Sequence, residues 1–234
     1  MQVCARTLAA DTLKALAKVE HRADFVLAAQ ESEMTLAVRK PDDARLQWAK
    51  EILSNPDAKH PHRWSKIYAQ ESQHLSAYAD EVTIKLQAFR IGDIGIAAMP
   101  CEVFAETGLE IKNQSPHEAT FSIELANGYS GYLPPREQHE LGGHETWPAR
   151  SSFLEIDAEE KIRAEVLRVL EKVHADDAAP CSELATDELD AVSMLGGPLA
   201  KLPAEKINFA KLPRLPIKHA VISDVRDQGG KQVN

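Results

Sequence analysis

Hydrophobic and polar residues recur along the chain with two different periods, which predicts a mixture of helices and strands. Apolar residues at helical spacing predict helices over the first stretch to about residue 19 and over 42–53, 63–79, 102–112 and 156–173. Alternation predicts strands over 33–39, 82–89 and 120–125, and an uninterrupted apolar run predicts another over 94–99. Asp11 or Thr12 is a candidate cap for the first helix, and Asp42 begins the second. A turn at Gly92 predicts an antiparallel hairpin between the two central strands.

These elements predict an α/β (α+β) fold, in which a small mixed or antiparallel sheet is packed by helices on one face. The strands that begin near Val82, Ile94 and Thr120 form that sheet. After His174 the periodicity ends, and residues 175–218 contain many prolines and a Gly-Gly pair. We therefore expect one folded unit over residues 1–174 and a linker-like, irregular C-terminal arm over residues 175–234, with one short strand over 220–225.

Composition and charge narrow the classes of function. The chain has 234 residues, with 27 Lys and Arg against 36 Asp and Glu, and a formal net charge of −9. A balance this acidic argues against nucleic acid or an anionic membrane surface as the main partner. No apolar run approaches the roughly 18 to 20 residues of a transmembrane segment, and the first residues lack the pattern of a signal peptide. The sequence leaves the compartment open.

Cysteine and histidine spacing gives little support for a metal site built from local motifs. Cys4, Cys101 and Cys181 lie far apart with no CxxC pair, which excludes a structural zinc knuckle and leaves buried or incidental thiols. His60 and His62 form an HxH pair in a proline-containing loop. Such a pair can bind metal, and solvated loop residues are the simpler interpretation. No P-loop, GxGxxG or HExxH motif is present.

Two segments are candidates for chemistry. Glu102 follows a buried strand and opens a predicted helix, where a carboxylate either serves a site at the junction or only favours the helix N-terminus. Residues 127–150 form a long segment rich in glycine, proline and aromatic residues. Loops of this length inside a compact domain are usually functional or disordered. The interleaved aromatic and polar residues favour function, and the alternative is a loop held by aromatic packing.

Five short motifs together resemble the later part of the catalytic domain of the neutral/alkaline non-lysosomal ceramidases, especially shorter bacterial relatives. They are Phe89-Arg90-Ile91-Gly92-Asp93, Pro100-Cys101-Glu102-Val103-Phe104, Leu125-Ala126-Asn127-Gly128-Tyr129, Gly131-Tyr132-Leu133-Pro134 and Gly142-Gly143-His144-Glu145. The resemblance runs from Val82 to about Val173 and extends more loosely to the residues before Val82.

The resemblance implies a zinc-dependent amidase that cleaves the N-acyl bond of ceramide, a reaction of sphingolipid metabolism. The family holds its zinc with two histidines, one glutamate and one tyrosine, and the motifs place Glu102 at the glutamate and Tyr132 at the tyrosine. A second tyrosine of the family stabilises the oxyanion, and His144 stands at its position. Imidazole can donate the same hydrogen bond. The implied ligand is a lipid amide or another small acyl substrate.

The resemblance also implies parts that the sequence does not contain. The family's zinc-binding histidines and catalytic serine segment precede the glutamate motif, and the chain's early histidines lack their local contexts; these are His21, His60, His62 and His74. We therefore expect an incomplete part of a larger layered zinc-hydrolase domain, which binds zinc only when complete and is inactive alone. Its partner is the missing N-terminal part or another copy, and the sheet should expose an unusually large apolar surface.

Two further interpretations accompany the enzyme. The first is a non-catalytic binding or structural module of the same family, which the missing histidines favour. The second concerns the tail, where residues 220–230 resemble the opening of a sialidase-like propeller domain. That stretch ends before any catalytic residue of such a domain appears.

Overall fold

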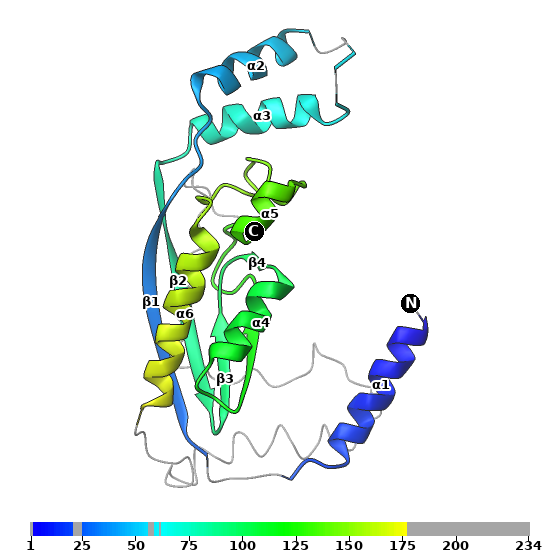
Figure 1. Ribbon diagram of the computed structural model, residues 1–234, viewed down its shortest axis with the longest axis vertical. Coiled ribbons are helices and arrows are strands. Elements are labelled where there is room, and N and C mark those ends of the chain that lie inside the picture. The colour runs from blue at the N-terminus through cyan, green and yellow to red at the C-terminus, as the bar shows by residue number, and fades with distance from the viewer. Residues whose placement is uncertain (1, 21–24, 56–58, 61, 177–234) are drawn as a thin grey trace, which may run out of the picture.

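The computed structural model describes residues 2–20, 25–55, 59–60 and 62–176 of the chain. The helices are α1 (Gln2–Leu16), α2 (Asp43–Ser54), α3 (Ser65–Ser76), α4 (Ala105–Gln114), α5 (Arg136–Leu141) and α6 (Ala158–His174). The strands are β1 (Leu27–Ala37), β2 (Glu81–Ile91), β3 (Ile94–Ala98), β4 (Glu102–Val103), β5 (Ala119–Ile123) and β6 (Tyr132–Leu133). Figure 1 shows the larger sheet along the long axis, with the α2–α3 pair at one end and α1 apart from the sheet.

The larger sheet is mixed, as the sequence predicts. Its strand order is β1-β2-β3-β5, with β2 antiparallel to β1 and β3, and β5 parallel to β3. The β2–β3 hairpin closes at Ile91 and Ile94, and Gly92 in the turn has a φ of 59°. Helix α4 lies between β3 and β5 in the sequence, so the parallel pair is joined by a helical crossover. A separate two-stranded sheet pairs β4 with β6.

Helix α6 covers one face of the sheet and forms the core with it. Its apolar positions Ile162, Val166 and Leu170 are fully buried, and α6 contacts β1, β2 and β3. Alternate residues of β2, such as Leu86 and Ala88, point toward this helix and are also fully buried. This confirms the predicted helix over 156–173 and the predicted half-buried strand over 82–89. The helical spacing in one and the alternation in the other both arise from the interface that the two elements share.

The opposite face of the sheet carries exposed apolar side chains, as expected. Leu27, Ile91 and Ile94 occupy neighbouring register positions across three strands, and each is between 41% and 47% exposed. Phe121 and Ile123 of β5 continue this face at similar exposure. None of the described helices buries these residues, so within the described part of the chain apolar side chains on this side stay partly exposed across four strands.

Three details of the sequence prediction are wrong. β1 begins at Leu27 rather than at Glu33, because backbone pairing with β2 runs from Leu27–Ile91 to Ala37–Glu81 and does not need alternating apolar residues. Helix α1 already includes Asp11 and Thr12, so neither residue caps it. The helix expected from Glu102 begins at Ala105, because Glu102 and Val103 pair with β6 instead.

The other elements of the structure that can be compared with the sequence prediction agree with it. Asp42 caps α2, its Oδ1 accepting a hydrogen bond from the Arg45 N–H at 2.7 Å. α3 and β5 fall within the predicted ranges to within a few residues. The division at residue 174, the arm over 175–234 with its expected strand and the sialidase-like stretch extend outside the described residues. Among the helices described, none combines the length and apolar character needed to cross a bilayer.

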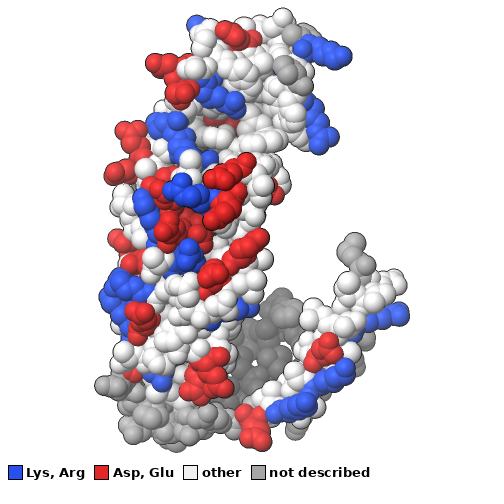
Figure 2. Space-filling view, in the orientation of Figure 1, with Lys and Arg blue, Asp and Glu red and all other residues white. Residues whose placement is uncertain are grey.

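Charged side chains of both signs are intermingled over the face of the molecule that Figure 2 shows. On α6, Glu165 forms hydrogen bonds both within its own helix and to β1. Its Oε2 accepts from the Arg168 Nε at 2.8 Å, and its Oε1 accepts from the Ser32 hydroxyl of β1. The hydrogen bond from Arg168 is the main cause that lowers the pKa of Glu165 to about 2. Glu165 therefore ties α6 to β1 in its ionised form.

Replacing this carboxyl should make acid stability less steep. A folded-state pKa below the ordinary value of a carboxyl stabilises the protein above about pH 4.5, and this stabilisation disappears as the pH falls toward 2. We expect Glu165→Gln to lower the free energy of unfolding by about 1 to 2 kcal/mol at pH 7 and to match the parent below about pH 2. Denaturant titrations across this pH range measure the difference. Glu171→Gln, an exposed position on the same helix, is the control, and equal losses from both variants would contradict the assignment.

Candidate active site

Glu102 and Tyr132, thirty positions apart in the sequence, occupy opposite positions of the parallel β4–β6 ladder. The Glu102 N–H donates to the Gly131 carbonyl at 3.0 Å, which fixes the register. Adjacent strands of a ladder lie about 4.8 Å apart, and paired residues point to the same side. The two side chains named by the sequence therefore lie next to each other. Both are partly exposed, whereas the flanking Cys101 and Leu133 are buried in the core.

Gly131 allows the backbone to enter strand β6 at Tyr132. Its φ is 76°, a region that glycine adopts without strain. A Cβ at this position would lie 2.6 Å from the Ser151 carbonyl oxygen. The same oxygen accepts a hydrogen bond from the Tyr132 N–H at 2.8 Å. The close approach of residue 131 to Ser151 therefore sets the position of Tyr132.

Tyr129 joins the pair through its hydroxyl, which donates to Glu102 Oε1 at 3.3 Å. Desolvation is the main cause that raises the pKa of both Tyr129 and Tyr132, and the negative charge of Glu102 adds to it. In the protein without a cation, both phenols are therefore neutral at pH 7. The sequence identifies the Gly-Tyr motif but does not reveal that Tyr129 contacts this carboxylate.

His144 lies against Tyr132. The two ring centroids are 5.5 Å apart in an edge-to-face arrangement. His144 Nδ1 lies 3.2 Å from Glu145 Oε1, and the His144 side chain is 61% exposed. The His144 ring thus contacts both the Tyr132 ring and the Glu145 carboxylate.

Three residues near this cluster receive no role from the sequence, namely Glu145, Tyr68 and Trp147. The negative charge of Glu145 contributes to raising the pKa of Tyr132 and of Tyr68, after desolvation. Tyr68 of α3 contacts the Trp147 indole edge-on, with centroids 5.0 Å apart. They reach the cluster from α3 and the loop before α6, and only the tertiary fold brings these segments together. Arg150 secures this loop by donating to Glu71 of α3 at 2.7 Å.

The described residues contain no group of three or more His, Cys, Asp and Glu that could hold a metal ion. His62, one member of the HxH pair, packs edge-on against Trp147, with centroids 5.7 Å apart. It also lines a hollow of about 510 Å³ together with Tyr68, Trp147 and His144. Glu102 and Tyr132 are therefore two neighbouring oxygen donors, with a histidine beside them.

Comparison with known proteins gives matches to solved structures only. No family model matches the chain, and no curated protein does. A neutral ceramidase from Pseudomonas aeruginosa is 14% identical with a TM-score of 0.43, covering 70% of this chain and 31% of that protein. A ceramidase complexed with C2 is 12% identical with a TM-score of 0.44, covering 72% of this chain and 34% of that protein.

Both of these solved structures are ceramidases. The chain spans about a third of the length of each of them. Neither comparison assigns a role to any residue of this chain.

Proposed function

We propose that Glu102 and Tyr132 are two ligands of a zinc site in a ceramidase-like amidohydrolase, which hydrolyses the N-acyl amide bond of a ceramide-type lipid or a similar acyl substrate. The observation that carries the proposal is their pairing across the β4–β6 ladder, with His144 against the Tyr132 ring. The motif resemblance supports the same three residues. The remaining ligands come from protein outside the described residues.

The donor chemistry fits two positions of such a site. Zinc is bound in proteins by carboxylate oxygen at about 2.0 to 2.2 Å and is usually four-coordinate in structural and catalytic sites. Glu102 offers an anionic oxygen and Tyr132 a phenolic one, both partly exposed on one side of the ladder. Two donors alone hold zinc weakly, because the binding free energy must also order and desolvate the ligands. We therefore infer that this chain is not an active enzyme by itself.

The residues around the pair have defined roles in the proposed reaction. Zinc, when bound, polarises an amide carbonyl and makes hydroxide available near neutral pH. Glu102 contributes the negative charge that holds the cation, and Tyr132 contributes a neutral or ionised oxygen. His144, which contacts the Tyr132 ring and the Glu145 carboxylate, donates a hydrogen bond from its imidazole to the developing oxyanion. One such hydrogen-bond donor is worth about 2.7 to 4 kcal/mol in other enzymes.

Zinc titration by equilibrium dialysis tests the ligand assignment. We expect the isolated chain to bind zinc more weakly than about 1 µM, because complete four-ligand sites provide about 10 to 16 kcal/mol. Glu102→Gln and Tyr132→Phe should each weaken this binding about tenfold or more, whereas Glu106→Gln, in the first turn of α4, should leave it unchanged. Binding unaffected by the first two variants would contradict the assignment.

An activity measurement separates the enzyme from the non-catalytic module. The chain alone should release no fatty acid from a ceramide, and release should appear only with zinc and a complementary protein that supplies histidine ligands. If the complemented protein binds zinc through Glu102 and Tyr132 but releases no fatty acid, the non-catalytic interpretation is the correct one.

A further inference from the structure

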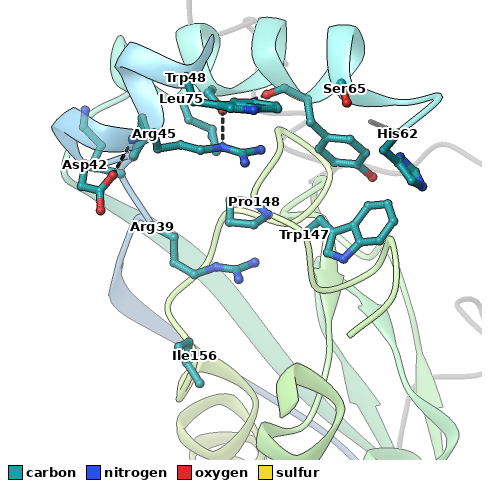
Figure 3. Close-up of a pocket in the computed structure, with 14 residues that line it drawn as sticks. Arg39, Asp42, Arg45, Trp48, His62, Ser65, Leu75, Trp147, Pro148 and Ile156 are labelled. Atoms are coloured by element: carbon teal, nitrogen blue, oxygen red, sulfur yellow. Dashed lines mark hydrogen bonds between the residues drawn. The ribbon is translucent and has the colours of Figure 1, made fainter. Parts of the chain in front are cut away.

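A cavity of about 680 Å³ lies between the α2–α3 pair and the loop before α6 (Figure 3), and no role proposed above uses it. Its volume falls within the range of sites for small molecules, about 300 to 1,000 Å³. Aromatic side chains form much of the wall, namely Trp48, Tyr68 and Trp147. Such walls can pack against an aromatic or hydrocarbon part of a ligand. The polar groups at the cavity determine which charged or polar group that ligand carries.

Arg39 projects into this space from the segment that follows β1. Its Nη1 donates to the Thr146 carbonyl at 2.9 Å, and its Nη2 donates to the Ser152 carbonyl and hydroxyl, both at 2.7 Å. Among the described residues, its buried Nε has no hydrogen-bond partner. Burial lowers the pKa of Arg39 to about 10. The guanidinium is thus a partly desolvated cation bonded to neutral oxygens, and two of its five N–H groups, that of Nε and one of Nη1, make none of these bonds.

Arg45 of α2 reaches the cavity from the other side. Its guanidinium lies over the Trp48 indole, 3.9 Å from the ring centroid, and its Nε donates to the Ser72 hydroxyl at 3.0 Å. Burial lowers the pKa of Arg45, and the nearby Asp42 carboxylate partly opposes this shift. Asp42 is already the cap of α2. In the described part of the chain, neither arginine forms an ion pair with a carboxylate.

Two cations in an aromatic cavity are unusual in a chain whose net charge is −9. Burial costs both guanidinium groups hydration free energy, and an anion that pairs with them recovers part of it. Guanidinium groups match the planar fork of a carboxylate, with which they form paired hydrogen bonds. In Figure 3 both guanidinium groups extend toward the region of Pro148 and Trp147.

We propose that this cavity binds a small organic carboxylate, whose charged end lies between Arg39 and Arg45 and whose apolar body packs on Trp48, Tyr68 and Trp147. The proposal does not depend on zinc or on the function of Glu102. A polyanion such as nucleic acid does not fit, because it needs a run of cationic groups along a surface, whereas this partly open cavity offers two arginines in a chain whose net charge is −9.

Calorimetric titration with 3-phenylpropionate, and with 3-phenylpropionamide as its uncharged counterpart, tests the proposal on the full chain. We expect the carboxylate to bind at least tenfold more tightly than the amide, because only the carboxylate pairs with both guanidinium groups. Added salt should weaken carboxylate binding more than amide binding. Equal affinity for the two compounds would overturn the proposal.

The matched variants are Arg45→Gln and Arg63→Gln. Each removes a guanidinium that lies over a tryptophan, but Arg63 stacks on Trp64 at 4.8 Å and does not line this cavity. Arg45→Gln should weaken 3-phenylpropionate binding about tenfold or more, and Arg63→Gln should leave it unchanged. Arg39 is unsuitable as the first variant, because its hydrogen bonds also hold the loop at Thr146 and Ser152. Equal behaviour of the two variants would place the ligand elsewhere.

Discussion

Replacing Gly131 with alanine should lower the free energy of unfolding by about 3 kcal/mol or more, because two separate costs fall on one position. The added Cβ would lie 2.6 Å from the carbonyl oxygen and 2.7 Å from the carbonyl carbon of Ser151. Both atoms belong to the backbone, so no side chain can rotate away. The φ of 76° adds the strain that alanine suffers in this region. Chemical denaturation of Gly131→Ala measures the loss.

Gly142 provides the matched control for this change. Its φ is 78°, almost the same as that of Gly131, but no heavy atom lies within 4 Å of its hypothetical Cβ. Gly142→Ala should therefore lower the free energy of unfolding only through backbone strain, by about 1 to 2 kcal/mol. Similar losses for the two variants would show that the approach to Ser151 does not matter. A shift of Tyr132 in the Gly131 variant should also weaken zinc binding, since Ser151 holds the Tyr132 N–H.

Leu86→Ala should have the second large effect, a loss of about 2 to 5 kcal/mol in the free energy of unfolding. Leu86 is fully buried at the centre of β2, on the face that packs against α6. Removing its side chain leaves a cavity beneath a helix and two neighbouring strands, which cannot collapse into it without breaking their ladder. Urea titration followed by far-ultraviolet circular dichroism measures the change.

The same atoms can be removed at an exposed position. Leu109 on α4 is 57% exposed, and alanine is a favourable residue inside a helix. Leu109→Ala should therefore change the free energy of unfolding by no more than about 0.5 kcal/mol. If Leu86→Ala were equally mild, the β2–α6 interface would not be the main source of stability.

The parts of the fold that follow from sequence are those with a local physical cause. The apolar stripe of α6, the alternation in β2 and the Asp42 cap each depend on residues a few positions apart. The mixed α/β sheet with helices on one face follows from the order of these elements. Exposed apolar residues on the other face follow from strands such as β5, in which Phe121 and Ile123 have no described helix to bury them.

The parts that do not follow depend on contacts between distant segments. The start of β1 at Leu27 is set by pairing with β2 and not by its own side chains. Glu102 favours a helix start by composition, yet pairing with β6 places it in a strand. The motifs name Glu102, Tyr132 and His144, and the fold brings these residues together, but their roles stay predictions. Tyr68 joins them through tertiary packing alone, whereas Glu145 follows His144 directly in the sequence.

The two-residue ladder between β4 and β6 makes the candidate site a product of the whole fold. Glu102 and Tyr132 belong to separate stretches of chain, and each stretch has too little pairing of its own to persist in water. Any chemical property that requires both side chains must therefore vanish in one step with the cooperative melting of the domain. A probe of that property, such as the change in the ultraviolet absorbance of Tyr132 when a cation is added, would report the fraction of the protein that is folded.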